Sequence, residues 1–126
     1  MVTAMFKDND KAIYLQIADR ICDDILAGRL ADESRLPSVR DYAASVEVNA
    51  NTVMRSYDYL ASIDVIYNKR GIGYFVSPGA GATVARRRRD ELFRGRLNDV
   101  FADLHLLGID PDTLKSEYVK YLESAK

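Results

Sequence analysis

The chain has 126 residues, of which 48% are hydrophobic and 29% are charged. This length suits one domain with a short appendage. No apolar stretch approaches the roughly 20 residues needed to cross a bilayer. The formal net charge of −1 argues against nonspecific coating of nucleic acid by bulk charge. Any specific nucleic-acid binding would therefore depend on where the basic residues lie.

The single cysteine, Cys22, and the single histidine, His105, restrict the chemistry further. They exclude an internal disulfide and a Cys/His zinc site within one chain, and we expect no metal or other cofactor. Cys22 lies on an apolar helical face, which favours a buried structural thiol over a redox sensor. Residues 1–10 lack the basic-then-apolar layout of a secretory signal. The lack of this signal and of a membrane-spanning stretch predicts a cytoplasmic protein.

The first predicted helix begins near Lys11. Isoleucines recur every fourth residue, which predicts a helix that packs one face on a core; they are Ile13, Ile17, Ile21 and Ile25. Gly28 follows this stripe and predicts its end. Residues 29–35 then form a polar connector.

Two further helices are predicted in quick succession. Ser38 can cap a short helix whose apolar positions extend to Val46, and Asn49 can cap the next. The apolar face of that next helix comprises Val53, Tyr57, Leu60 and Ala61. Two short helices joined by a tight turn are typical of a helix-turn-helix.

A β-hairpin is predicted after the third helix. Residues 65–68 and 74–76 are β-prone, and the Lys-Arg-Gly-Ile-Gly stretch at 69–73 separates them. Three helices followed by a two-stranded hairpin is the element order of a winged helix. The predicted fold is therefore mostly α with a small β-hairpin.

The third helix presents polar side chains suited to reading bases. Asn51 and Arg55 lie nearly opposite its apolar face, while Asn49 and Thr52 lie near its start, the part that enters a major groove. Asn can bond adenine and Arg can bond guanine in bidentate fashion. The alternative is an ordinary amphipathic helix whose polar face contacts water.

The hairpin and the second helix add basic residues to this set. Lys69 and Arg70 lie at the hairpin tip beside Gly71, where backbone can approach a surface closely. Such a tip suits contact with phosphates or the minor groove. Arg40 adds a cation on the expected DNA side, and Arg35 is a weaker candidate.

Residues 78–82 form a glycine-containing break that predicts a linker after a winged helix-turn-helix domain at 11–77. A long helix is expected from 83 to 107, with apolar residues spaced four, three, four and three apart; they are Phe93, Leu97, Val100, Leu104 and Leu107. Asp110 and Pro111 then begin a last helix. Residues 83–126 are thus a predicted two-helix dimerisation region, since a soluble monomer rarely exposes so large an apolar strip.

Three motifs occur in a familiar order: Leu-Pro-Ser-Val-Arg at 36–40, Val-Asn-Ala-Asn-Thr-Val-Met-Arg at 48–55, and Arg-Gly-Ile-Gly-Tyr-Phe-Val at 70–76. With residues 14–18 as a first helix, they resemble the N-terminal domain of the GntR family of regulators. The resemblance implies DNA contacts from Arg40, Asn49, Asn51, Thr52, Arg55, Lys69, Arg70 and Gly71. Two places in the sequence depart from the family pattern. Glu47 stands where the family commonly has glycine, and Ile63-Asp64 stands where a Glu-Gly pair is frequent before the wing.

The short tail is similar to that of the YtrA subfamily, which implies dimerisation through the tail. Two helices cannot easily enclose a drug-sized ligand, so we expect no small-molecule effector site. The resemblance implies a transcription regulator, a repressor that binds a palindromic double-stranded DNA operator as a homodimer.

The sequence also bears on two other function classes. His105 is accompanied by no catalytic triad, carboxylate pair or phosphate loop, so an enzyme is not expected. A winged helix used for protein contact is the alternative, with Tyr59 as the one exposed aromatic candidate. The four arginines at 86–89 are a solvated face, a contact with DNA backbone, or ion-pair partners of the nearby Asp90 and Glu91.

Overall fold

The computed structural model describes residues 11–125. Residues 1–10, whose sequence lacks the pattern of a secretory signal, lie outside the described part. The chain divides into two compact units, one ending at Arg86 and the other beginning at Arg87. We call them the winged-helix unit and the tail unit, and each is described by itself. Within residues 11–125, no helix has the length and apolar character required to span a membrane.

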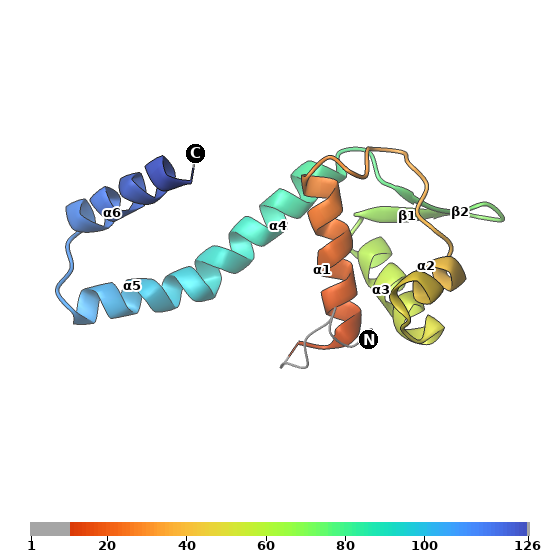
Figure 1. Ribbon diagram of the computed structural model, residues 1–126, viewed down its shortest axis with the longest axis horizontal. Helices are drawn as coiled ribbons and strands as arrows, with labels where there is room; N and C mark the ends of the chain where they lie inside the picture. The colour runs from red at the N-terminus through yellow and green to blue at the C-terminus, as the bar shows by residue number, and fades with distance from the viewer. Residues whose placement is uncertain (1–10, 126) are drawn as a thin grey trace. The chain divides into compact units, whose positions relative to one another are not determined.

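The winged-helix unit has the element order that the sequence predicts (Figure 1). It contains α1 (Ile13–Leu26), α2 (Val39–Val46), α3 (Ala50–Ser62), β1 (Ile66–Lys69), β2 (Gly73–Val76) and the first part of α4 (Ala80–Arg94). Both predicted N-caps are present. The Ser38 hydroxyl accepts a hydrogen bond from the Asp41 N–H, and the Asn49 side chain accepts one from the Asn51 N–H.

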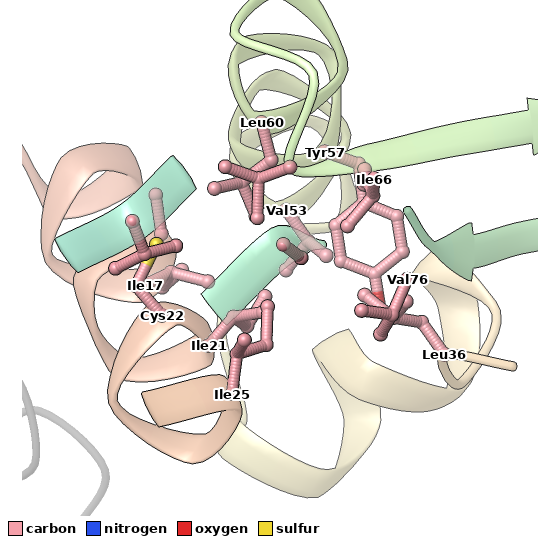
Figure 2. Close-up of a cluster of buried hydrophobic side chains, with 14 of the residues drawn as sticks. Ile17, Ile21, Cys22, Ile25, Leu36, Val53, Tyr57, Leu60, Ile66 and Val76 are labelled. Atoms are coloured by element: carbon pink, nitrogen blue, oxygen red, sulfur yellow. The ribbon is translucent and has the colours of Figure 1, made fainter. Parts of the chain in front are cut away.

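The core of this unit joins one face of each helix to the hairpin (Figure 2). The members with the largest fully buried side chains come from α1, α3 and the segment around the hairpin; they are Ile17, Val53, Tyr57, Leu60, Val65, Ile66 and Val76. Cys22 belongs to the same cluster, which confirms the predicted buried thiol. Three isoleucines of the predicted stripe in α1, Ile17, Ile21 and Ile25, thus pack in this core. The fourth, Ile13 at the start of the helix, is 44% exposed.

The turn between α2 and α3 depends on Glu47. Its φ of 53° and ψ of 47° lie in the left-handed region, which favours glycine but is open to other residues at an energetic cost. The turn therefore keeps its shape without the glycine that is common in the resembled family.

The hairpin gains a third pairing segment. β1 and β2 pair antiparallel with Ile66 opposite Val76. On the other side of β2, the Val76 N–H donates to Ser34 O and the Leu36 N–H donates to Tyr74 O, each at 2.9 Å. The predicted polar connector at 29–35 is therefore in part an extended segment that covers one edge of the wing.

The structure corrects the expected linker at 78–82. Ala80 begins α4 and is fully buried, and Val84 on the next turn is 2% exposed. Both belong to the core cluster of the winged-helix unit. Their apolar side chains draw the start of α4 into this core, so the compact unit extends to Arg86 rather than to residue 77.

The long helix expected from 83 to 107 is divided. α4 ends at Arg94 and α5 spans Arg96–Leu106, because Gly95 takes φ −104° and ψ −105°, outside the helical region. A Cβ on Gly95 would lie 3.0 Å from the Glu91 carbonyl oxygen. Glycine thus permits the break.

The tail unit comprises the rest of α4, α5 and α6 (Pro111–Ser124). As predicted, Asp110 caps α6. Its carboxylate accepts a hydrogen bond from the Thr113 N–H, which lowers the pKa of Asp110. No residue of α5 or α6 is buried. The described part of this unit therefore has no core of its own.

Candidate nucleic-acid interface

The polar face of α3 is exposed as the sequence predicts. Asn51 and Arg55 are exposed and Thr52 is half-buried, while Val53 on the opposite face is fully buried. Asn51, Thr52 and Arg55 line a shallow hollow of about 330 Å³, closed on its other side by the start of α1 at residues 12–14. The structure brings these three predicted contacts together.

Asn49 has a structural role at the start of α3. Its Oδ1 accepts the Asn51 N–H at 2.7 Å, which leaves the two amide hydrogens of the side chain to donate elsewhere. Free N–H groups of a helix N-terminus also favour a phosphate oxygen. Capping and DNA contact are thus compatible at this residue.

Arg55 has a neighbour that sequence reasoning missed. Its guanidinium carbon lies 4.1 Å from the centre of the Tyr14 ring, so the cation stacks on an aromatic face. Tyr14 in turn meets Tyr59 edge to face, with ring centres 6.3 Å apart. The apolar helical stripe that contains Tyr14 indicated only core packing. The sequence of one helix does not show which residues of another helix lie against it.

The wing presents Lys69, Arg70 and Gly71 at its exposed end. The Lys69 ammonium lies 4.7 Å from the centre of the Phe75 ring, so this side chain is partly ordered by a cation–π contact. Gly71 has φ 80°, a left-handed conformation that suits glycine in a tight turn.

Arg35 supports the wing from the neighbouring segment. Its Nη2 donates a hydrogen bond to the Ile72 carbonyl at 2.6 Å. Gly73 allows this approach, since a Cβ there would lie 3.2 Å from Arg35 Nε. Arg35, the weaker candidate for DNA contact, therefore orders the wing backbone.

Arg40 is exposed on α2, two residues after the Ser38 cap. The start of α2 is tied to α3, because the Tyr57 hydroxyl donates to the Pro37 carbonyl at 2.7 Å. Burial raises the pKa of Tyr57 well above its ordinary value, with Tyr42 and Tyr74 adding to the effect. The hydroxyl thus remains a neutral donor.

The predicted dimerisation residues fall on both sides of the Gly95 break. Phe93 is in α4, Leu97, Val100 and Leu104 are in α5, and Leu107 caps its end. Phe93, Val100 and Leu107 are 49%, 44% and 70% exposed; Leu97 and Leu104 are half-buried.

The sequence of residues 13–76, just over half of the chain, matches the profile of the bacterial regulatory proteins of the gntR family. The chain belongs to the GntR family. Its relatives include the HTH-type transcriptional regulator YhcF of Bacillus subtilis, 31% identical over 84% of this chain and 86% of the relative. The HTH-type transcriptional repressor YtrA of the same organism is 29% identical over 89% of this chain and 85% of the relative.

Solved structures agree with this assignment. A putative GntR-family regulator from Bacteroides thetaiotaomicron is 49% identical, covers 91% of this chain and 100% of its own, and superposes with a TM-score of 0.82. YtrA from Sulfolobus acidocaldarius, a GntR-family transcription factor, is 27% identical over 75% of this chain and 100% of its own, with a TM-score of 0.57. The match includes the tail, so the chain is a YtrA-like member of the GntR family.

Family membership establishes the general role of the winged helix. GntR regulators are DNA-binding transcriptional regulators, a class distinct from enzymes. The protein-contact alternative depended on Tyr59 as an exposed aromatic. In this GntR domain Tyr59 is half-buried and packs on Tyr14, which removes that argument.

Proposed function

We propose that this chain is a sequence-specific repressor that binds a palindromic DNA operator as a homodimer. The observation that supports it is the tail unit, in which α5 and α6 bury no residue yet display many large apolar side chains. The most exposed of these are Leu106, Leu107, Tyr118 and Tyr121. A second copy of the chain is the partner that would cover them and pair two winged-helix units.

The proposed division of DNA contacts follows the geometry of each element. Asn51, Thr52 and Arg55, gathered at one hollow on α3, suit base edges in the major groove, with Asn49 at the helix start. Arg40 and the wing residues 69–71 lie on other elements and suit phosphates, which position the protein without reading sequence.

We further propose that no small-molecule effector binds within this chain. The hollow beside α4 is lined by Arg87, Asp90, Glu91 and Arg94. Ligand pockets are mostly apolar with few polar groups, so this charged lining suits solvent or ion pairs better.

The test begins with DNA selection from a random double-stranded pool by the full chain. The expected product is an inverted repeat, and the sedimentation coefficient of the free protein should be that of a dimer. Leu97→Asp with Leu104→Asp should give a monomer with at least about tenfold weaker binding to the selected duplex, a loss of ~1.4 kcal/mol. Asn98→Asp adds one negative charge to α5 outside the stripe, against two in the double variant, and should change neither the oligomeric state nor the affinity. A wild-type monomer at every concentration, or a consensus without symmetry, would contradict the proposal.

Base reading and repression have their own measurements. Arg55→Ala should lower affinity for the consensus by ~1–3 kcal/mol while sparing random DNA, whereas Lys69→Ala should weaken both alike. Equal losses for Arg55→Ala on both duplexes would remove its base-reading role. A reporter gene with the consensus in its promoter should fall in expression when the chain is present; a rise would indicate an activator.

A further inference from the structure

We propose that Tyr14 is a positioning residue for DNA reading: its ring holds the Arg55 guanidinium in a fixed orientation on the surface of α3. This inference rests on the proposed function, because it requires that Arg55 contacts a base. It adds a specificity determinant on α1, a helix that contributes no direct contact in the proposed interface.

The first step is the stacking geometry. Arg55 is exposed and its guanidinium carbon lies 4.1 Å from the Tyr14 ring centre. A cation–π contact requires no hydrogen-bond acceptor, so the guanidinium N–H donors that do not face the ring remain available for the paired hydrogen bonds that guanine accepts. The stack therefore orders the side chain without using its donors.

The second step is the rigidity of the ring itself. The fully buried Ser56 hydroxyl donates a hydrogen bond to the Tyr14 carbonyl at 2.8 Å, which ties the start of α1 to α3. Tyr59 meets the ring edge to face. Ser56 and Tyr59 both belong to α3, the same helix as Arg55. The Tyr14 ring is therefore held in place by the helix that carries the cation.

The third step is the place of this pair in the interface. Tyr14 and Arg55 both line the hollow that Asn51 and Thr52 also line. A long arginine side chain loses rotamer freedom when it is immobilised on DNA. Ordering it beforehand reduces that loss, and only the sequence that matches the fixed donors gains from it.

The experiment compares Tyr14→Leu, which removes the aromatic face, with Tyr14→Phe, which keeps the face and lacks the hydroxyl. Binding of full chains is measured on the consensus duplex that the wild type selects and on a scrambled duplex of equal length. We expect Tyr14→Leu to lose about two- to five-fold on the consensus and little on the scrambled duplex, the range for an exposed cation–π contact. Tyr14→Phe should retain wild-type specificity, and thermal unfolding reports any general damage to the fold.

A double-mutant cycle with Arg55→Ala separates positioning from packing. If Tyr14 acts through Arg55, then Tyr14→Leu should cause no further loss of specificity in the Arg55→Ala background. Additive losses, or equal losses on both duplexes, would overturn the role of Tyr14 and leave the proposed function intact. Unaltered specificity in Arg55→Ala would overturn the role of Tyr14 together with the base-reading role of Arg55. Failure of the wild type to select a consensus would overturn both the role of Tyr14 and the proposed function.

Discussion

The substitution Tyr57→Phe tests how the core of the winged helix determines the position of α2. It removes the hydroxyl that donates to the Pro37 carbonyl at 2.7 Å and leaves the ring. The ring is fully buried and meets Tyr42 and Tyr74 edge to face, with centres 6.2 and 5.1 Å apart. These packing contacts do not require the hydroxyl, so the variant isolates one hydrogen bond.

The expected loss in the free energy of unfolding is about 1 kcal/mol. A neutral intramolecular hydrogen bond contributes ~0.5–1.5 kcal/mol net. Pro37 is an exposed residue, so we expect water to replace the hydroxyl at its carbonyl in the variant, which avoids the penalty of an unsatisfied buried acceptor. Tyr57→Leu, which also removes the ring, should cost roughly 3 kcal/mol because it leaves a cavity in the core.

The effect of pH has a definite sign. The pKa of Tyr57 is raised by burial above its ordinary value of 10.0, so the folded chain retains the phenolic proton to higher pH than the unfolded chain does. The corresponding stabilisation is complete below pH 10 and is lost as the pH rises toward the folded pKa. Phenylalanine does not titrate, so the difference between wild type and Tyr57→Phe should shrink above about pH 10.

Urea unfolding followed by circular dichroism at neutral pH and at about pH 11 measures both effects. The two proteins are compared at equal concentration, since association would make the apparent stability depend on concentration. A loss of more than about 3 kcal/mol for Tyr57→Phe would refute the assignment of one solvent-reachable hydrogen bond. A difference that grows at alkaline pH would refute the protonation argument.

Three further substitutions test the local geometry. Glu47→Gly should raise the free energy of unfolding by about 0.5–1 kcal/mol, since φ is 53° there and left-handed backbone favours glycine; a fall in urea midpoint would contradict this. Ser38→Ala should cost about 1 kcal/mol through loss of the cap on Asp41 N–H, whereas Ser38→Asp should retain stability if capping is the cause. Gly73→Ala places a Cβ 3.2 Å from Arg35 Nε at φ 146° and should displace the wing. Fluorescence anisotropy should then show about fivefold weaker binding to both consensus and random DNA, a loss of ~1 kcal/mol. Unchanged affinity would show that the wing contributes little.

The winged-helix elements could be predicted because each depends on local pattern. The four-residue spacing in α1 and the Ser38 and Asn49 caps are properties of short sequence windows, and all are present in the structure. The hairpin was expected within one residue of its observed strands. The polar character of Asn51 and Arg55 likewise indicated an exposed face on α3.

The boundary between the two units could not be predicted in the same way. The residues at 78–82 have the composition of a linker, yet Ala80 and Val84 are drawn into the core of the winged-helix unit. A small apolar residue is as common in a linker as in a tightly packed helix start, so composition alone does not distinguish them. The break at Gly95 was missed for a similar reason, since a single glycine inside a heptad pattern is tolerated in many helices.

The sequence by itself determined the fold class, the family and the side chains that face away from the core of α3, because periodicity, capping and motif order are local. The tertiary structure alone decided which residues act on those side chains. Arg35 reaches Ile72 and Tyr14 reaches Arg55 across 37 and 41 positions of the chain, and the Glu33–Leu36 region pairs with β2. Such contacts depend on how helices and strands pack against one another, and no short window of sequence contains both partners.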